Sequence, residues 1–240
     1  DYLIGAMRRA GKLPEHPYFL KTIVTTEMAR KVAEANGVTC CDTFTGFKFM
    51  AEKKNQLESQ GLGHVIMSYE ESYGYMLGDY VRDKDAVTAS LILTEMAAWY
   101  AVQGMTLFDA LEALYRKYGF YGEKTHNLVM PGLDGLEKMA ALMKSLRADP
   151  PTHIAGVAVL RRKDYTDGSV IDCRTGEKTA MELSGSNVLR YELADDTAIL
   201  VRPSGTEPKI KVYILTIGKD EAERDENLAK YSQWVATLTK

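Results

Sequence analysis

The chain has 240 residues, enough for one large domain or two ordinary ones, and 45% hydrophobic with 26% charged residues is the composition of a soluble globular protein. Its 30 Lys and Arg against 33 Asp and Glu give a formal net charge of -3, which argues against a general affinity for nucleic acid. Its three cysteines form neither a disulfide framework nor a zinc spacing, and no apolar run has the length of a membrane span. We therefore expect a cytoplasmic protein without a membrane partner.

The first half of the chain alternates predicted helices and strands. An amphipathic helix opens it and stops near Gly11. Apolar runs then predict strands at 21–24, 38–41 and 64–69, and helical spacing predicts helices between them at 28–35 and 47–60. This order predicts a parallel sheet with helices on both faces, in which ligands bind beyond the carboxyl ends of the strands.

Two further helices precede an expected domain boundary. Apolar residues at helical spacing predict a helix over 86–103, and a capping box formed by Thr106 and Asp109 opens another. Glycines and prolines then cluster between 119 and 135, which predicts a boundary near 122–134. We divide the chain into a domain at 1–125 and a second domain at 126–240.

The second domain has a different order of elements. Its pattern predicts a helix at 136–147, strands at 154–160, 188–193, 197–201 and 210–217, and a charged helix from 220 to the end. A hairpin turn is expected at 194–196. Two helices against consecutive strands predict a small α+β domain with a mainly antiparallel sheet.

The connection that begins at Arg202 carries groups that can bind a phosphate. Arg202 offers a planar fork of donors that matches phosphate oxygens in pairs. Ser204 and Thr206 add hydroxyl donors, and Gly205 lets successive backbone N–H groups turn toward one point. Lys211 adds positive charge from the next strand. On spacing alone, a polar turn whose Pro and Gly serve only its geometry is an equally good interpretation.

A second candidate site follows the third strand, at 69–75. Glu70 can accept hydrogen bonds from adjacent sugar hydroxyls, Ser72 can both donate and accept, and the aromatic neighbours suit the faces of a sugar ring. In isolation, two adjacent glutamates are more often part of a solvated acidic loop.

Two shorter segments can contribute to the same site. Gly46 lets the backbone approach a ligand at a helix N-terminus, although a plain helix entry with Phe44 and Phe47 in the core is the interpretation that the residues alone favour. Lys84 lies in a charged cluster that is also typical of a solvated helix cap, and it is close enough in sequence to Glu70 to reach the same cleft.

Together these segments resemble the phosphoglucomutase/phosphomannomutase (α-D-phosphohexomutase) superfamily over essentially the whole chain. The residues at 202–208 (RPSGTEP) are similar to the family's C-terminal phosphate-binding loop, and those at 69–74 (YEESYG) to its sugar-binding loop. The resemblance implies the third and fourth of four domains. These would be an α/β/α sugar-binding domain and a TBP-like α+β phosphate-binding domain.

The resemblance also implies roles for individual residues. It assigns sugar contacts to Glu70, Ser72, Thr45 and Gly46, and contacts with the phosphate that is not transferred to Arg202, Ser204, Gly205, Thr206 and Lys211. Lys84 resembles a cleft lysine that assists proton transfer or orients the sugar, so its expected role is auxiliary. No other catalytic residue and no metal ligand is expected in this chain.

The reaction implied by the resemblance is an intramolecular phosphoryl transfer, an isomerase activity. A phosphoserine of the first domain phosphorylates the sugar phosphate, the bisphosphate reorients, and its other phosphoryl returns to the serine, with Mg²⁺ held by an acidic loop of the second domain. This sequence has neither the serine motif nor the acidic loop. We therefore expect the C-terminal part of a longer enzyme, with the first two domains as partners in the same chain and no turnover alone.

The expected substrates are glucose 1-phosphate and glucose 6-phosphate, with glucose 1,6-bisphosphate as intermediate, because the longer E-E-S-Y-G form favours glucose or pentose phosphates. A phosphopentomutase or phosphomannomutase of the same family stays open. So do a stand-alone phosphosugar-binding module without catalysis and an interaction domain with degenerate loops.

Overall fold

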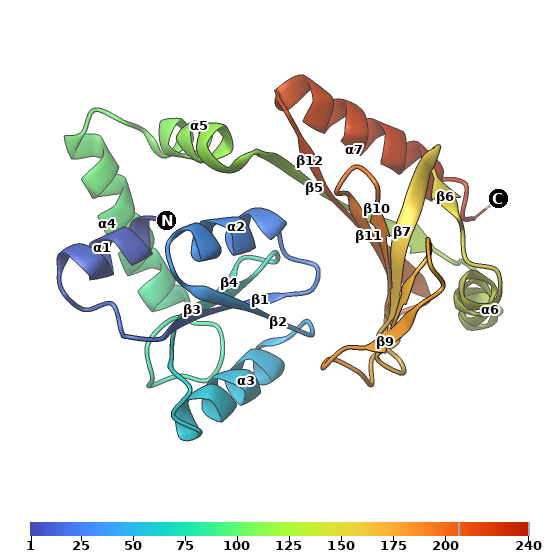
Figure 1. Ribbon diagram of the computed structural model, residues 1–240, viewed down its shortest axis with the longest axis horizontal. Coiled ribbons are helices and arrows are strands. Elements are labelled where there is room, and N and C mark those ends of the chain that lie inside the picture. The colour runs from blue at the N-terminus through green and yellow to red at the C-terminus, as the bar shows by residue number, and fades with distance from the viewer. Residues whose placement is uncertain (206, 240) are drawn as a thin grey trace. The chain divides into compact units, whose positions relative to one another are not determined.

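The computed structural model describes residues 1–205 and 207–239. It divides into two compact units, the first over Asp1–Gly119 and the second from Phe120 onward (Figure 1). The division lies six residues before the domain boundary at 125/126 expected from the sequence, because β5 (Phe120–Val129) pairs along its whole length with β12 (Lys209–Gly218) of the second unit. The residues of β5 do not alternate between apolar and polar, so the sequence did not predict a strand there.

A four-stranded sheet forms the centre of the first unit. Its order is β2-β1-β3-β4, and its strands are β1 (Pro17–Thr22), β2 (Thr39–Thr43), β3 (His64–Glu70) and β4 (Gly74–Met76). β1 runs parallel to both β2 and β3, which confirms the predicted parallel sheet. The short β4 was not expected, and it returns antiparallel to β3. The strand predicted at 21–24 begins earlier, and its last residues turn away while Ile23 stays buried.

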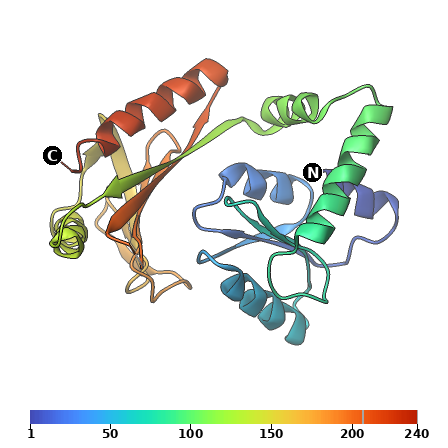
Figure 2. The same ribbon diagram turned by 180° about the vertical axis from the view of Figure 1, so that it is seen from behind.

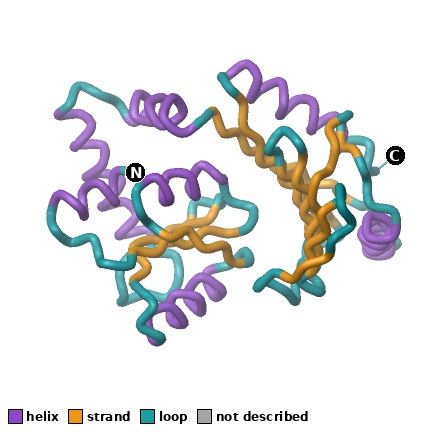
Figure 3. Tube along the Cα trace, in the orientation of Figure 1, coloured by secondary structure: helices purple, strands orange, loops and turns teal. Residues whose placement is uncertain are grey.

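Helices cover both faces of this sheet, as the sequence predicted (Figure 3). The helices of the first unit are α1 (Tyr2–Arg9), α2 (Glu27–Ala35), α3 (Phe47–Ser59), α4 (Ala86–Val102) and α5 (Leu107–Tyr118). Neighbouring residues of a strand face opposite ways, so Phe19 packs with the core under α1 and α2 while Leu20 packs with the core under α3. The capping box of Thr106 and Asp109 at the start of α5 is confirmed.

The second unit is an antiparallel sheet with helices on one face (Figure 2). The path of strands is β5-β12-β11-β10-β7-β8-β9, with β6 paired to β7. Besides β5 and β12 the unit contains α6 (Gly135–Ala148), β6 (His153–Ile154), β7 (Val157–Asp164), β8 (Ser169–Asp172), β9 (Lys178–Ala180), β10 (Leu189–Leu193), β11 (Ala198–Pro203) and α7 (Glu221–Val235). This confirms the expected α+β class. The strands β5, β8 and β9 were not predicted from the sequence.

One continuous core holds the helices of the second unit against its sheet. Ile210, Val212 and Ile214 alternate along β12 and point into this core, where they meet Met143 of α6 and Tyr231 of α7. The intervening side chains of β12 therefore leave the opposite face of the sheet. None of the described helices combines the length and the apolar character that crossing a membrane requires.

Candidate functional site

The connection between β11 and β12 gathers the predicted phosphate ligands of the second unit. Arg202 pairs directly with Lys211 across the two strands, so both side chains leave the same face of the sheet. At the tip, the Ser204 N–H donates to the Lys209 carbonyl oxygen at 2.8 Å, which closes the hairpin. Thr206, a further predicted phosphate ligand, lies outside the described residues.

A hollow opens at this hairpin tip. Its lining consists of Arg202, Pro203, Ser204, Gly205, Glu207, Lys209 and Lys211. A hydrogen bond from Lys209, strengthened by the charges of Lys209 and Lys211, holds the pKa of Glu207 below its ordinary value. Among the residues that the structure describes, Arg202 and Lys211 form no ion pair. A Cβ at Gly205 would meet no atom within 4 Å, so the loop backbone is open to a ligand at this point.

Glu70, the last residue of β3, is the centre of the candidate sugar site in the first unit. Its pKa is raised, first by partial burial and then by the neighbouring charge of Glu71. Two groups oppose this shift, the positive charge of Lys84 and the backbone N–H of Gly46 at the start of α3. Gly46 has φ 113°, in the left-handed region that favours glycine. The structure thus brings Glu70, Gly46 and Lys84 together from three segments.

Gly74 makes the close approach of this site to the core possible. A Cβ on Gly74 would lie 2.5 Å from Cε2 of the buried Phe47 and 3.1 Å from Oε1 of Glu70. On the same ring, the Lys84 ammonium lies 5.9 Å from the Phe47 centroid, within range of a cation–π contact. Phe47 therefore serves the core, as the simple interpretation of a helix entry had it, and also supports Lys84. The sequence had not indicated Gly74 as a site residue.

Ser72 lies in the exposed turn between β3 and β4. Its hydroxyl donates to Glu71 Oε1 at 3.4 Å. The next residue, Tyr73, is 89% exposed and has φ 64°, an unusual backbone conformation for a non-glycine residue. Thr45 is half-buried directly before Gly46. It therefore borders the Glu70 site through its neighbour in the chain.

Glu71 makes contacts that the sequence did not indicate. Its Oε2 accepts hydrogen bonds from the hydroxyls of Thr22 at 3.2 Å and Thr25 at 3.1 Å. Those two hydroxyl oxygens are also 2.8 Å from each other, and both threonines are fully buried. The two adjacent glutamates therefore have different surroundings, with Glu70 facing α3 and Glu71 facing the loop between β1 and α2.

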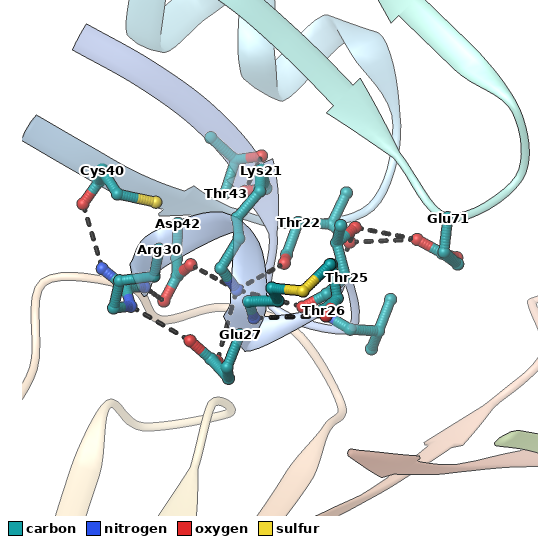
Figure 4. A network of polar contacts seen from close by, with 12 residues as sticks. Lys21, Thr22, Thr25, Thr26, Glu27, Arg30, Cys40, Asp42, Thr43 and Glu71 are labelled. Atoms are coloured by element: carbon teal, nitrogen blue, oxygen red, sulfur yellow. Dashed lines mark hydrogen bonds and ion pairs between the residues drawn. The ribbon is translucent and has the colours of Figure 1, made fainter. Parts of the chain in front are cut away.

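Next to these threonines, the buried Lys21 belongs to a network with three charged side chains that are only partly buried (Figure 4). The Lys21 ammonium is fully buried, 3.0 Å from Asp42 Oδ1 and 3.3 Å from Glu27 Oε1. Arg30 balances the second carboxylate charge, with contacts of 2.6 Å to Asp42 and 3.0 Å to Glu27. A lysine in an otherwise apolar strand indicates a buried ion pair, because a buried charge needs a partner of opposite charge. The sequence alone does not say which residues provide the carboxylates.

Two further observations concern the thiol of Cys40 and possible metal ligands. Burial raises the pKa of Cys40 to about 12, so its thiol is protonated at neutral pH. Among the residues that the structure describes, no group of three or more His, Cys, Asp or Glu is placed to hold a metal ion.

Comparisons with known proteins agree in both units. Residues 2–118 match phosphoglucomutase/phosphomannomutase, alpha/beta/alpha domain III, and residues 127–230 match the C-terminal domain of the same family. The chain is 36% identical over 199 residues to a phosphoglucomutase of Staphylococcus aureus strain bovine RF122 / ET3-1, and 35% identical over 199 residues to that of strain N315. Each match covers 83% of this chain and 36% of the relative.

Solved structures show the same fold. The Paramecium phosphoprotein pp63/parafusin, a phosphoglucomutase in an open form, aligns with a TM-score of 0.60 at 18% identity, over 92% of this chain and 36% of its own. A phosphoglucomutase/phosphomannomutase family protein of Burkholderia thailandensis aligns with 0.54 at 16% identity, over 99% of this chain and 40% of its own. The chain thus spans little more than a third of the length of these proteins. It belongs to the phosphoglucomutase/phosphomannomutase family and contains that family's α/β/α domain III and its C-terminal domain.

Proposed function

We propose that this chain is the substrate-binding C-terminal half of a phosphoglucomutase, which interconverts glucose 1-phosphate and glucose 6-phosphate through a phosphoserine and glucose 1,6-bisphosphate. The observation that carries the proposal is the Arg202–Lys211 pair. Like charges directly opposite each other on neighbouring strands are destabilising. A bound phosphate dianion would turn this repulsion into two attractive contacts, so the pair is favourable in a protein that binds phosphate there.

In this proposal the hairpin tip binds the phosphate that is not being transferred. The planar guanidinium of Arg202 suits two phosphate oxygens at once, whereas Lys211 acts as a point charge. Ser204 and Gly205 line the same hollow and would add hydroxyl and backbone donors. Thr206 is proposed as a further hydroxyl donor from its position in the sequence.

The Glu70 region would bind the sugar. A carboxylate only accepts hydrogen bonds when ionised, so Glu70 can hold two sugar hydroxyls that donate to it. Lys84 lies near enough to lower the pKa of Glu70, and it would orient a hydroxyl or assist a proton transfer as an auxiliary group. Ser72, Thr45 and Gly46 are proposed to complete the sugar contacts from the adjoining turn and helix start.

The transfer of the phosphoryl group itself is assigned to another part of the parent enzyme. Such a transfer depends on a positioned nucleophile and on neutralisation of the developing charge. We propose that the family's first two domains supply the phosphoserine and the Mg²⁺ loop, and that this chain binds and orients the substrate without turnover of its own. The cytoplasmic location expected from the cysteines stays a prediction.

Titration of the isotope-labelled chain with glucose 6-phosphate, followed by NMR, tests the proposal. Amide shifts should appear at the hairpin tip, and Arg202→Ala should weaken binding by about tenfold or more, because a hydrogen bond to a charged group contributes about 1.5–3 kcal/mol. The exposed Lys219→Ala is the control and should leave the affinity unchanged. A folded chain without shifts near Arg202 would contradict the proposal.

Parallel titrations decide the substrate class. Ribose 5-phosphate, mannose 6-phosphate and inorganic phosphate would be compared with glucose 6-phosphate under the same buffer conditions. Glucose 6-phosphate should bind most tightly and should also shift the amides around Glu70, whereas inorganic phosphate should shift only the hairpin tip. Equal binding of all four compounds would support phosphate recognition but overturn the assignment to glucose.

A further inference from the structure

The two adjacent glutamates of the turn after β3 have separate tasks. We propose that Glu71 is a positioning residue that fixes the β3–β4 turn, and with it Ser72, to the buried hydroxyls of Thr22 and Thr25. The inference rests on the proposed function in so far as Ser72 is a sugar contact. It concerns a residue that the proposed function leaves without a role.

The first argument is the direction in which Glu71 makes its contacts. Oε2 is 3.2 Å from the Thr22 hydroxyl and 3.1 Å from the Thr25 hydroxyl, while Oε1 accepts from Ser72 at 3.4 Å. Both carboxylate oxygens are therefore engaged within the protein. Glu71 thus connects the exposed turn to the buried end of β1, and Glu70 is left to face the ligand.

The second argument is the number of protons available. Thr22 and Thr25 carry one hydroxyl proton each, but three oxygen–oxygen contacts join them and Glu71. The charged carboxylate is the stronger acceptor, because charge-assisted hydrogen bonds are stronger than neutral ones. Both protons are therefore best placed toward Glu71. Without the carboxylate, one hydroxyl would bond to the other, and the turn would lose these two hydrogen bonds to the interior.

The third argument is that the two hydroxyls are themselves held in place. The buried Lys21 ammonium donates to the carbonyl oxygens of Thr22 at 3.3 Å and Thr25 at 3.1 Å, and so closes the loop between β1 and α2 (Figure 4). Asp42 and Glu27 hold the lysine in turn. Thr22 and Thr25 are 0% and 1% exposed. The anchor of Glu71 therefore belongs to the buried interior, whereas the turn carrying Ser72 is exposed.

The turn needs such an anchor for a structural reason. Tyr73 has φ 64° and its side chain is 89% exposed, so little packing holds this residue in its unusual conformation. β4 is only three residues long and adds three pairings to β3. Because Glu71 is the residue of the turn that bonds to the interior, its loss should free Ser72 to move.

The decisive experiment measures backbone order in the ligand-free chain by ¹⁵N relaxation. Glu71→Ala should lower the order parameters of residues 71–73 from values near about 0.85 toward about 0.6. Thr22→Val with Thr25→Val, which replaces the two hydroxyls with methyl groups, should have the same effect, and adding Glu71→Ala to that pair should change little. Glu71→Gln keeps one acceptor oxygen and should restore part of the order. The exposed Glu52→Ala on α3 is the matched control.

Ligand titrations separate a positioning role from general loss of structure. Glu71→Ala should weaken binding of glucose 6-phosphate by about fivefold to tenfold, because the proposed hydrogen bond between Ser72 and the sugar would be lost. It should leave the binding of inorganic phosphate unchanged. Unchanged order of the turn in Glu71→Ala would overturn the inference, even if the unaltered chain binds glucose 6-phosphate. If the unaltered chain fails to bind glucose 6-phosphate, the proposed function fails, while the relaxation data still decide whether Glu71 anchors the turn.

Discussion

Arg202 on β11 stands directly opposite Lys211 on β12, and neither forms an ion pair with any other residue that the structure describes. Like charges in this position repel each other, and the nearby carboxylate of Glu207, whose pKa Lys211 helps to lower, offsets part of that repulsion. A bound phosphate would offset more of it. If the chain binds phosphate as proposed, the stability of the second unit should therefore depend on the phosphate content of the buffer.

The substitution Lys211→Gln should stabilise the chain in phosphate-free buffer of low ionic strength. The free energy of unfolding should rise by about 0.2–1 kcal/mol, since one of two opposed like charges is removed. Added phosphate should raise the unfolding temperature of the unaltered chain more than that of the variant, because a ligand stabilises the state to which it binds. Lys219→Gln, on an exposed residue, controls for net charge. Equal stabilisation of both chains by phosphate would refute a contribution of Lys211 to binding.

Much of the candidate phosphate site followed from the sequence because it is local. The sequence indicated both Arg202 and Lys211 because only a short connection separates them along the chain. The strand expected at 197–201 ended before Arg202, so the direct pairing of the two residues was not predicted. Thr106 and Asp109 gave the start of α5 for a similar reason, since a capping box spans only four residues.

What could not be predicted depends on partners that are distant in the sequence. β5 has polar residues on both of its faces, and only its pairing with the buried β12 makes it a strand. Lys21 was expected in a strand, but its partner Asp42 lies on a neighbouring strand that follows a whole helix. The contact of Glu71 with Thr25 spans 46 positions. A single sequence contains no periodicity that reports such contacts.

The carboxyl of Glu70 should titrate above its ordinary pKa of 4.5, because burial and the charge of Glu71 both disfavour ionisation. The folded chain then holds this proton more tightly than the unfolded chain. The free energy of unfolding should accordingly fall as the pH rises from 4.5 through the raised pKa of the folded state, and Glu70→Gln should remove that slope. Carbon-detected NMR of the side-chain carboxyl gives the midpoint directly.

Lys84 gives a sharper test of the same environment. Its positive charge opposes the upward shift of the Glu70 pKa, so Lys84→Met should move the midpoint further up. Lys31→Met, on an exposed residue of α2, should leave the midpoint where it is. A Glu70 midpoint that does not respond to Lys84→Met would show that the two side chains do not share a site.

Replacing the buried Lys21 should destabilise the first unit strongly. Lys21→Met keeps most of the length of the side chain but removes the ammonium, which donates to the carbonyl oxygens of Thr22 and Thr25 and pairs with Asp42. We expect a loss of about 3 kcal/mol, the lower end of the range for breaking a buried ion pair, because Arg30 still neutralises part of the charge. Urea unfolding measures this loss. Lys31→Met should change stability by less than about 0.5 kcal/mol, and an equally small effect of Lys21→Met would contradict the structure.

Gly74→Ala should destabilise the first unit by about 1–3 kcal/mol, the usual cost of forcing an extra methyl group into a packed region. The new Cβ would lie 2.5 Å from Cε2 of Phe47, a ring that is only 5% exposed and has little room to withdraw. Because the same methyl group would lie 3.1 Å from Oε1 of Glu70, glucose 6-phosphate binding should weaken as well.

A second substitution at the ring separates the clash from other effects of Gly74→Ala. Phe47→Leu removes the ring atoms that the new methyl group meets, so the double variant should be more stable than the sum of the two single losses predicts. Gly5→Ala on α1, whose Cβ would meet only the flexible end of Arg9 at 3.3 Å, should be neutral or slightly stabilising. Strictly additive losses at 47 and 74 would mean that the methyl group and the ring do not meet.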